Sequence, residues 1–379
     1  MPVRVAVLKE VAPGEARVAL TPEVVPRMVK AGLEVILQAG AGGASRYLDA
    51  AYTQAGARVE PDRATVLASA DVLVKIQIPT TEETAGLRPG TVVVALMNAN
   101  RNLDKVAKLR DQKITSFALE LLPRITRAQS MDVLSSQATV AGYRAALIGA
   151  DLCPKFLPML TTAAGTVRPA RVLILGAGVA GLMAIATSKR LGAIVEAYDV
   201  RRAAGEQVRS LGARFLELQI NAEGSGGYAR ELTEDEKKQE AEMVAKAVAE
   251  ADIVITTANV PGRRAPLLVR TAMVERMRPG AVIIDLAAES GGNVELTQPG
   301  TEIEVNGVRI VGPLNLPSQL PFHASQMFAK NVEAFLKLLI APTGGLVTDY
   351  TDEILAASLL TRNGEVVHAP TRDALAAGK

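Results

Sequence analysis

The sequence feature that most constrains the fold is a glycine-rich turn after an apolar strand. The stretch RVLILGAGVAG leads from that strand into Gly176-x-Gly178-x-x-Gly181, and the helical stretch LMAIATSKRL follows. In this pattern the first glycine permits a tight turn, the second lets the backbone approach a pyrophosphate, and the third lets the helix pack against the strand. The next predicted strand ends at Asp199, 18 residues after Gly181. An acid about 20 residues after the turn binds the adenosine ribose in dinucleotide folds. The pattern therefore predicts a Rossmann-type dinucleotide-binding domain.

The acid that ends the second strand also bears on which dinucleotide binds. The carboxylate of Asp199 is expected to accept hydrogen bonds from the ribose hydroxyls, and its charge would repel a 2′-phosphate, which favours NAD over NADP. Arg201 and Arg202 follow closely, and an arginine at that place can accommodate the phosphate. The pattern favours NAD without excluding NADP.

The rest of the chain alternates short apolar runs with helical patterns, which is typical of βαβ units and a mostly parallel sheet. In the first third we predict strands at Val3–Leu8, Glu34–Leu37, Val72–Ile76, Val92–Leu96 and Ile114–Phe117, and helices at Pro22–Ala31 and Leu103–Asp111. In the middle third we predict strands at Val172–Leu175, Ile194–Tyr198, Ile253–Thr256, Val282–Asp285 and Val308–Val311. Two such arrays predict an α/β fold with two Rossmann-like, doubly wound parallel-sheet domains.

Two long helices are predicted to join these domains. Thr126 and Gln129 fit a capping box, which would open a helix through about Gly149, and apolar residues at helical spacing from Phe328 to Leu339 indicate a second amphipathic helix. We therefore predict a discontinuous first domain at 1–125 and 341–379, linking helices at 126–149 and 322–340, and a nucleotide-binding domain at 150–321. A cleft between the domains is the expected site.

Charge and rare residue types narrow the possible functions. The 42 Lys and Arg residues nearly balance the 40 Asp and Glu residues, which argues against nucleic acid as a partner, because its binding needs a concentrated basic surface. The single cysteine, Cys153, excludes an internal disulfide framework and a Cys-based metal site, and we expect no metal. Only His323 and His368 can supply histidine chemistry. The uncharged stretch Val172–Ser188 has 17 residues and contains the glycine turn, so we expect a soluble chain.

Polar residues gather at the start of the first predicted linking helix. In PRITRAQSMDVLSSQ the residues Gln129, Asp132 and Ser136 recur at helical spacing, and Arg124 and Arg127 precede them. Spacing alone favours a solvated helix start with a local Arg–Asp pair. The position at the expected cleft favours a nicotinamide site, because amide, carboxylate and guanidinium groups suit a carboxamide.

A charged and glycine-rich segment, Asn221–Glu240, interrupts the second domain. Its glycines predict flexibility and its charges predict solvation. By composition it is a surface loop; the alternative is a lid, with Tyr228 as its large apolar contact.

These stretches together resemble the NAD(H)-binding component of proton-translocating nicotinamide nucleotide transhydrogenases. The resemblance covers nearly the whole chain and is carried by RAQSMDVLSSQ, GAGVAG with its following acid, GGYARE, KEVAPGEARVALTPEVV and NLPSQLP. The RAQSMD stretch is the most specific, whereas the others are shared with the related alanine dehydrogenases. The resemblance implies two Rossmann-like domains joined by two long helices, with NAD(H) on the second domain.

The resemblance also implies roles for individual residues. The nicotinamide side, where the catalytic step takes place, would be formed by Arg124, Gln129, Asp132 and Ser135. The other cofactor-binding positions would be the glycine turn, which includes Val179, the ribose acid and a loop that closes over the nucleotide: Gly176, Gly178, Val179, Gly181, Asp199, Gly227 and Tyr228.

As implied by the resemblance, the chain is an enzyme component that works with partners. It would form a homodimer and pass a hydride from NADH directly to NADP⁺, which is held on the NADP(H)-binding domain of a beta subunit. A small membrane-spanning subunit would couple this transfer to proton translocation. The expected location is cytoplasmic and peripheral, at the cytoplasmic face of the inner membrane.

Alanine dehydrogenase, an amino-acid oxidoreductase, is the nearest alternative. Its pattern uses an Arg and a Lys for the substrate carboxylate, and Arg17 and Lys75 stand at matching places. Its catalytic histidine would follow the strand Val92–Leu96, where this chain has Met97, and its acid after a later strand is replaced by Glu289. Arg17 and Lys75 are either inherited from a common ancestor or serve packing and ion pairs, and we favour the second interpretation.

The missing histidine has a chemical meaning. Oxidative deamination needs a general acid–base, whereas hydride transfer between two nicotinamides needs only alignment, with the reacting atoms about 3–3.5 Å apart. The sequence therefore favours transhydrogenation. A non-catalytic NAD-binding regulator is a further alternative, although such a protein would not require the polar nicotinamide side.

Overall fold

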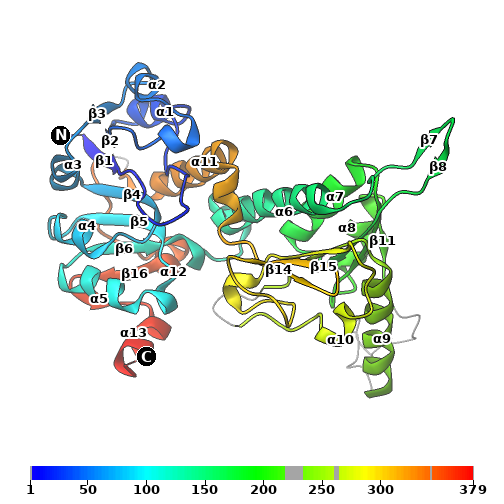
Figure 1. Cartoon of the computed structure of the whole chain (residues 1–379). Helices are drawn as coiled ribbons and strands as arrows, with labels where there is room; N and C mark the ends of the chain where they lie inside the picture. Colours follow the sequence, from blue (N-terminus) through cyan, green and yellow to red (C-terminus); the bar gives the residue numbers. More distant parts are fainter. Residues whose placement is uncertain (1, 218–233, 260–263, 342–343, 379) are drawn as a thin grey trace. The chain divides into compact units, whose positions relative to one another are not determined.

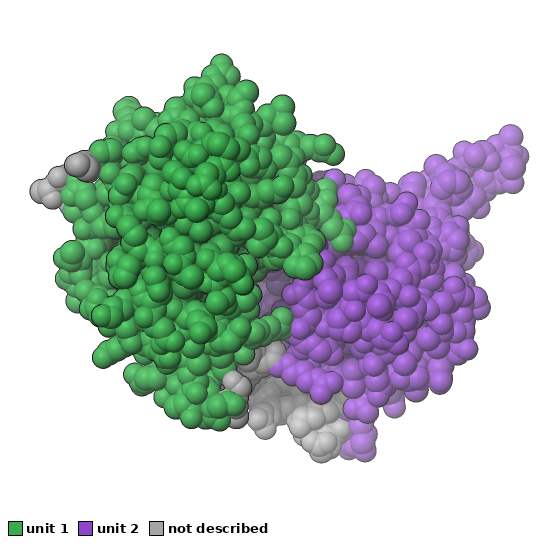
Figure 2. Space-filling view, turned by 60° about the vertical axis from the view of Figure 1, so that its left-hand side comes forward, with its two compact units in different colours: residues 1–137, 317–379 green, residues 138–316 purple. Residues whose placement is uncertain are grey.

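The computed structural model describes residues 2–217, 234–259, 264–341 and 344–378. The chain forms two compact units (Figure 2): unit 1 contains residues 1–137 and 317–379, and unit 2 contains residues 138–316. The chain thus leaves unit 1 between Gln137 and Ala138 and returns between Leu316 and Pro317. Each unit has its own sheet and core (Figure 1).

Unit 1 is built on an eight-stranded sheet with the order β17-β16-β6-β5-β4-β1-β2-β3. The strands are β1 (Val3–Val7), β2 (Leu33–Gln38), β3 (Arg58–Glu60), β4 (Val72–Gln77), β5 (Val92–Leu96), β6 (Thr115–Ala118), β16 (Leu359–Arg362) and β17 (Glu365–Val366). Strands β1 to β6 pair in parallel, and β16 joins β6 antiparallel. Val5 and Val7 pack into one core cluster and Ala6 into another. Strand β1 is therefore buried on both faces, as is typical of parallel sheets.

The helices of unit 1 cover these two faces. They are α1 (Val25–Lys30), α2 (Asp49–Gln54), α3 (Arg63–Ser69), α4 (Thr81–Ala85), α5 (Leu103–Asp111), α11 (Pro321–Leu339), α12 (Glu353–Ser358) and α13 (Ala369–Ala376). The predicted apolar stripe of α11 is confirmed, since Phe328, Val332, Phe335 and Leu339 are all buried in the core of unit 1.

Unit 2 is built on a seven-stranded sheet with the order β11-β10-β9-β12-β13-β15-β14. Its elements are β9 (Arg171–Leu175), β10 (Ile194–Tyr198), β11 (Arg214–Phe215), β12 (Ile253–Thr256), β13 (Val282–Asp285), β14 (Glu302–Val305), β15 (Val308–Val311), α6 (Val133–Leu152, which begins in unit 1), α7 (Val179–Arg190), α8 (Ala204–Ser210), α9 (Glu234–Glu250) and α10 (Thr271–Val274). All strands of the seven-stranded sheet pair in parallel except β14 with β15. Strand β9 lies between β10 and β12, so the order reverses there, as in the dinucleotide folds that bind their ligand at this point.

The predicted fold class, an α/β fold with two parallel-sheet domains, is confirmed. The predicted bounds of β5, β10, β12, β13 and β15 agree with the structure residue by residue. The sequence analysis missed short strands and edge strands: β3, β7 (Leu160–Thr162), β8 (Gly165–Val167), β11, β14, β16 and β17.

The predicted capping box at Thr126 is wrong. Residues Thr126–Met131 form a 3₁₀ helix whose first turn has no side-chain cap, and α6 begins only at Val133. The preceding Asp132 has non-helical backbone angles, and its Oδ1 accepts a hydrogen bond of 2.9 Å from the N–H of Ser135. A carboxylate at this place caps a helix strongly, so the α-helix starts after Asp132. Gln129 and Asp132 consequently do not share one continuous helical face.

Candidate nucleotide-binding site

The glycine turn between β9 and α7 has the geometry that its sequence predicts. Gly176 has φ +106°, which favours glycine, and its N–H donates a hydrogen bond of 2.8 Å to the carbonyl of Tyr198. A Cβ on Gly181 would lie 1.9 Å from the carbonyl oxygen of Gly176, so only glycine lets the helix approach the strand. A Cβ on Gly178 would meet nothing within 4 Å. The space beside Gly178 and the free N–H groups at the start of α7 fit a pyrophosphate.

Two contacts hold this turn from neighbouring elements. The Thr257 hydroxyl, which follows β12, donates a hydrogen bond of 3.0 Å to the Gly176 carbonyl. From α6, Gly142 lies so near that an added Cβ would be 2.0 Å from the carbonyl oxygen of Ala180, inside the glycine motif. The sequence analysis missed Thr257 and Gly142, because both contacts depend on which elements become neighbours of β9 and α7.

Asp199 follows β10 and is bonded directly to the glycine turn. It is 9% exposed, and its Oδ2 accepts a hydrogen bond of 2.7 Å from the Ala177 N–H. The Arg201 guanidinium donates to both carboxylate oxygens, at 2.9 and 3.0 Å, while 64% of its own side chain is exposed. Burial raises the pKa of Asp199, but the hydrogen bonds from Arg201 and from the backbone outweigh it and lower the pKa. The carboxylate is therefore charged at neutral pH and suited to accept ribose hydroxyls.

The loops beside the turn are tied together by Asp285, which ends β13 and is fully buried. Its Oδ1 accepts from the Thr256 hydroxyl at 3.0 Å, and its Oδ2 accepts from the Asn293 N–H at 2.8 Å. The Asn293 amide in turn donates to the carbonyl of Ala258 at 2.8 Å. These bonds fix the segments that follow β12 and β13, next to the carboxyl end of β9. The sequence analysis placed Asp285 in a strand but did not assign it this role.

The four residues predicted for the nicotinamide side lie in unit 1, and the structure brings two of them together. The Ser135 hydroxyl donates a hydrogen bond of 2.6 Å to Asp132 Oδ2. Arg124 and Gln129 are exposed, and within the described part of the chain neither side chain makes a hydrogen bond or an ion pair. Arg127 differs, because it pairs with Asp352 at 2.7 Å. Arg124 and Gln129 are therefore available to a ligand, whereas the guanidinium of Arg127 is held in an ion pair within unit 1.

Val179, the first residue of α7, is 42% exposed although it is apolar. Its exposure beside the glycine turn fits the predicted contact with the pyrophosphate side of a nucleotide. The predicted loop residues Gly227 and Tyr228 lie outside the described residues.

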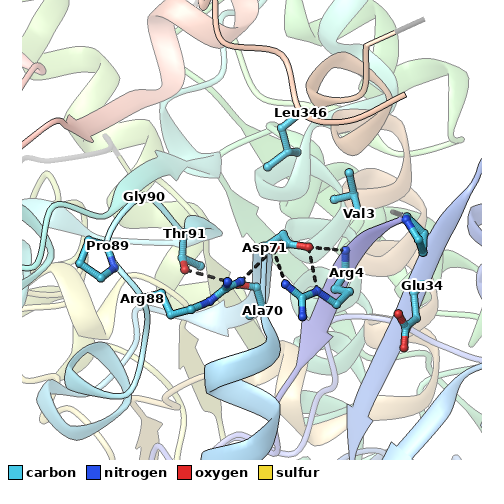
Figure 3. Close-up of a pocket in the computed structure, with 11 residues that line it drawn as sticks. Val3, Arg4, Glu34, Ala70, Asp71, Arg88, Pro89, Gly90, Thr91 and Leu346 are labelled. Atoms are coloured by element: carbon cyan, nitrogen blue, oxygen red, sulfur yellow. Dashed lines mark hydrogen bonds and ion pairs between the residues drawn. The ribbon is translucent and has the colours of Figure 1, made fainter. Parts of the chain in front are cut away.

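A pocket of about 670 Å³ lies in unit 1 at the amino ends of β1, β4 and β5 (Figure 3). Arg4 and Arg88 both reach Asp71 there, at 2.9 and 2.8 Å. Burial raises the pKa of Asp71, but the two guanidinium groups outweigh it and lower the pKa to about 2. Ligands of parallel α/β sheets bind at the carboxyl ends of the strands, and both cations are paired already. We therefore assign this pocket no role in nucleotide binding.

Neither a metal site nor a membrane-spanning helix is found among the described residues. No cluster of three or more His, Cys, Asp or Glu side chains is arranged to hold a metal ion in the part of the chain that the structure describes. Within the same residues, no helix combines the length and the apolarity needed to cross a bilayer.

Comparison with known families identifies both halves of the chain. Residues 6–141 match the alanine dehydrogenase/PNT N-terminal domain, and residues 145–369 match the alanine dehydrogenase/PNT C-terminal domain. The chain belongs to the alanine dehydrogenase/PNT family.

Within this family the chain is more similar to transhydrogenases than to alanine dehydrogenases. It is 48% identical over 375 residues to an NAD(P) transhydrogenase subunit alpha polypeptide of Rhodospirillum rubrum, covering 96% of this chain and 98% of the relative. A transhydrogenase structure from Sinorhizobium meliloti superposes with a TM-score of 0.86 at 44% identity, covering 97% and 99% of the two chains. Alanine dehydrogenase of Bacillus subtilis is 31% identical, over 97% of this chain and 94% of the relative. The predicted resemblance to transhydrogenases is confirmed.

Two cations that suggested the alanine dehydrogenase alternative are paired inside unit 1. Lys75 is 1% exposed, and its Nζ lies 3.0 Å from Glu83 and 3.2 Å from Glu10. Arg17 is 3% exposed and donates to both carboxylate oxygens of Glu15, at 2.7 and 2.6 Å. As predicted, both residues form ion pairs, and neither presents an uncompensated charge to a small carboxylate substrate.

The position after β5, where alanine dehydrogenases would place a histidine, is buried in this chain. The side chain of Met97 is fully buried, and its N–H donates a hydrogen bond of 3.0 Å to Glu120. Glu289, which replaces the acid of the alanine dehydrogenase pattern, accepts a hydrogen bond of 2.7 Å from the Asn315 N–H. The thioether of Met97 cannot serve as the general acid–base that deamination needs.

Proposed function

We propose that this chain is the NAD(H)-binding subunit of a proton-translocating transhydrogenase and passes a hydride between NADH and NADP⁺ held on a partner domain. The observation that carries the proposal is the similarity to transhydrogenase alpha subunits over nearly the whole of both chains. The buried Met97 in place of a histidine supports it, because hydride transfer between two nicotinamides moves no other proton at the reacting carbons.

Each candidate residue has a physical task in this reaction. The start of α7 and the open space at Gly178 would hold the pyrophosphate. Asp199 would hold the adenosine ribose, and the exposed Gln129 and Arg124 would orient the nicotinamide carboxamide. Bound NADH supplies the hydride, so the task of the chain is to align the ring and exclude competing orientations.

The proposal is tested by mixing the purified chain with NADH and NADP⁺, with and without a separately purified NADP(H)-binding domain. We expect hydride transfer, followed with deuterated NADH, only when the partner domain is present. Turnover with pyruvate and ammonium would instead support an alanine dehydrogenase. Nucleotide binding without turnover in any mixture would support a regulator.

We propose that the nucleotide on this chain is NAD(H), and Asp199→Ala tests the assignment. The change removes a charged acceptor of ribose hydrogen bonds, worth about 1.5–3 kcal/mol, so NADH affinity should fall roughly 10- to 100-fold. Discrimination against NADPH should fall as well, because the repulsion of the 2′-phosphate is lost. Nucleotide titrations measure both quantities.

Two further variants separate charge from folding in this test. Asp199→Asn keeps the size of the side chain and removes the charge, so it should relax the discrimination even where affinity is partly retained. Glu206→Ala removes an exposed carboxylate of the same unit and should leave both quantities unchanged. If both Asp199→Asn and Asp199→Ala discriminated against NADPH as strongly as the wild type does, Asp199 would not be the residue that recognises the adenosine ribose.

We propose that the chain forms a homodimer, and the hairpin β7–β8 supports this. Every residue of both strands is exposed, and the hairpin projects away from the rest of unit 2 (Figure 1). A lone two-stranded hairpin is marginally stable in water, and Phe156 and Met159 beside it are 60% and 64% exposed. A second copy of the chain would bury these side chains.

The double change Phe156→Asp with Met159→Asp is expected to convert the dimer to monomers, because charges placed in an apolar interface must be desolvated. Sedimentation equilibrium measures the result. Leu48→Asp, at an equally exposed apolar residue of unit 1, is the matched control and should leave the dimer intact. A wild-type chain that sediments as a monomer contradicts the homodimer, and a double variant that remains dimeric contradicts the role of the hairpin.

We also propose that a beta subunit with an NADP(H)-binding domain and a small membrane-spanning subunit hold this chain at the cytoplasmic face of the inner membrane. The chain should then sediment with membranes only when those subunits are present. Binding to protein-free vesicles would contradict this arrangement.

A further inference from the structure

The two places where the chain crosses between units are held by one buried ion pair in unit 1. Gln137 is the last residue before the first crossing, and Ser318 is the second residue after the return. Arg17 Nη1 donates a hydrogen bond of 2.9 Å to Gln137 Oε1, and the Ser318 hydroxyl donates one of 3.1 Å to Glu15 Oε1. The ion pair of Glu15 with Arg17 thus joins the outgoing and the returning segment.

Further hydrogen bonds restrain the outgoing and the returning segment. The Ala16 N–H donates to the Ser318 hydroxyl oxygen at 2.6 Å, and the Gln137 amide donates to the Ala324 carbonyl, in α11, at 3.1 Å. The side chains of Glu15 and Arg17 are 0% and 3% exposed. Burial raises the pKa of Glu15, but its bonds with Arg17 and Gln77 outweigh this and lower the pKa to about 2. The pair therefore stays ionised throughout the physiological range.

Helix α6 extends this connection to the nucleotide site. Gln137 lies in α6 inside unit 1, and the same helix continues into unit 2 as far as Leu152. Gly142, five residues after Gln137 and hence about 7.5 Å along the helix axis, packs directly on the Ala180 carbonyl of the glycine turn. A hydrogen-bonded helix bends little over five residues, so a change in the direction of α6 at Gln137 would also turn Gly142.

We infer that Glu15 and Arg17 are positioning residues, which set the direction of α6, and with it the dinucleotide turn, by holding Gln137 and Ser318 together. This gives Arg17 a task that requires no substrate carboxylate. The structural part of the inference stands by itself; only its consequence for hydride transfer rests on the proposed function.

The test uses variants that remove the side-chain hydrogen bonds at the two crossings and keep the buried ion pair of Glu15 with Arg17. Arg17→Gln would leave Glu15 buried and unpaired, which costs enough stability to threaten folding. Gln137→Met and Ser318→Ala remove one link each and leave the ion pair intact. Gln112→Met and Ser358→Ala are matched controls, because each removes a hydrogen bond of about the same length to a carbonyl elsewhere in unit 1.

Pulsed electron paramagnetic resonance measures the distance distribution between spin labels on the two units. A residue that only stabilises unit 1 should leave this distribution unchanged when it is replaced. Cysteines at the exposed positions Lys108 and Gln207, in a Cys153→Ser background, carry the labels, and an excess of unlabelled chain suppresses signals between protomers. We expect a broader distance distribution for Gln137→Met, a broader one for Ser318→Ala, and the broadest for the double variant. The two controls should give the wild-type distribution.

A double variant whose distance distribution equals that of the double control would overturn the inference. Thermal unfolding of the same samples shows whether the variants and controls lose comparable stability. In the transfer assay, the double variant should lose turnover while the Kd for NADH stays unchanged, because the nucleotide contacts on unit 2 are intact. If the wild-type chain transfers no hydride, the proposed function fails while the distance measurement still decides the role of Glu15 and Arg17.

Discussion

Gly181→Ala is expected to abolish NADH binding by disrupting the packing of unit 2. The added Cβ would lie 1.9 Å from the carbonyl oxygen of Gly176 and 2.9 Å from its carbonyl carbon. Both are backbone atoms, and the Thr257 hydroxyl holds the same carbonyl by a hydrogen bond, so the clash cannot be relieved by turning a side chain. Overpacking costs typically about 1–3 kcal/mol and sometimes more, and a backbone clash of this size belongs at the upper end. Amide hydrogen exchange in β9, β10 and β12, together with NADH titration, measures the two effects.

Two other glycines serve as controls for this prediction. Gly178→Ala meets no atom within 4 Å, so exchange protection should stay at the wild-type level while NADH affinity falls, because the methyl group occupies the space assigned to the pyrophosphate. Gly43→Ala, also in open space but in unit 1, should change neither quantity. The chain has no tryptophan, so NADH fluorescence reports binding without interference. Wild-type binding by Gly181→Ala would refute the packing argument, and wild-type binding by Gly178→Ala would refute the place of the pyrophosphate.

The sequence predicted those parts of the candidate site that depend on local order. The glycines and the acid after β10 follow one strand–turn–helix–strand pattern, so spacing alone located Gly176, Gly181 and Asp199. Continuous apolar runs likewise located the buried strands to within one residue at either end. In contrast, β14 (EIEV) and the exposed hairpin strands carry no such run. Edge strands bury little apolar surface, so hydrophobic pattern is a weak guide to them.

Contacts between distant segments could not be predicted in the same way. Thr257 reaches Gly176 across 81 positions of sequence, and the contact exists only because β12 lies beside β9. Arg17 reaches Gln137 across 120 positions of sequence, so this contact with the start of α6 could not be predicted from local sequence. The wrong helix start has a local cause, because Thr126 and Asp132 both compete to cap the same helix, and the carboxylate bonded to both the N–H and the hydroxyl of Ser135 prevails.

Gln129→Ala is expected to slow hydride transfer about 10²-fold while largely sparing NADH binding. The side chain is exposed and makes no hydrogen bond within the described residues, so its removal should cost the fold little. Its proposed task is to fix the carboxamide, and with it the face and distance of the nicotinamide ring. A misplacement of about 1 Å at the reacting centre can cost 10²-fold in rate. Single-turnover transfer to NADP⁺ on the partner domain measures the rate, and NADH titration measures the binding.

A matched change distinguishes this task from a general effect of shortening a glutamine. Gln54→Ala lies at the exposed end of α2, in the same unit, and should leave both the transfer rate and the Kd for NADH unchanged. The decisive pattern is a slow chemical step at saturating NADH in Gln129→Ala alone. A variant that loses NADH affinity but transfers hydride at the wild-type rate once saturated would make Gln129 a binding residue, and the alignment of the ring would then fall to Arg124 and to the pair of Asp132 with Ser135.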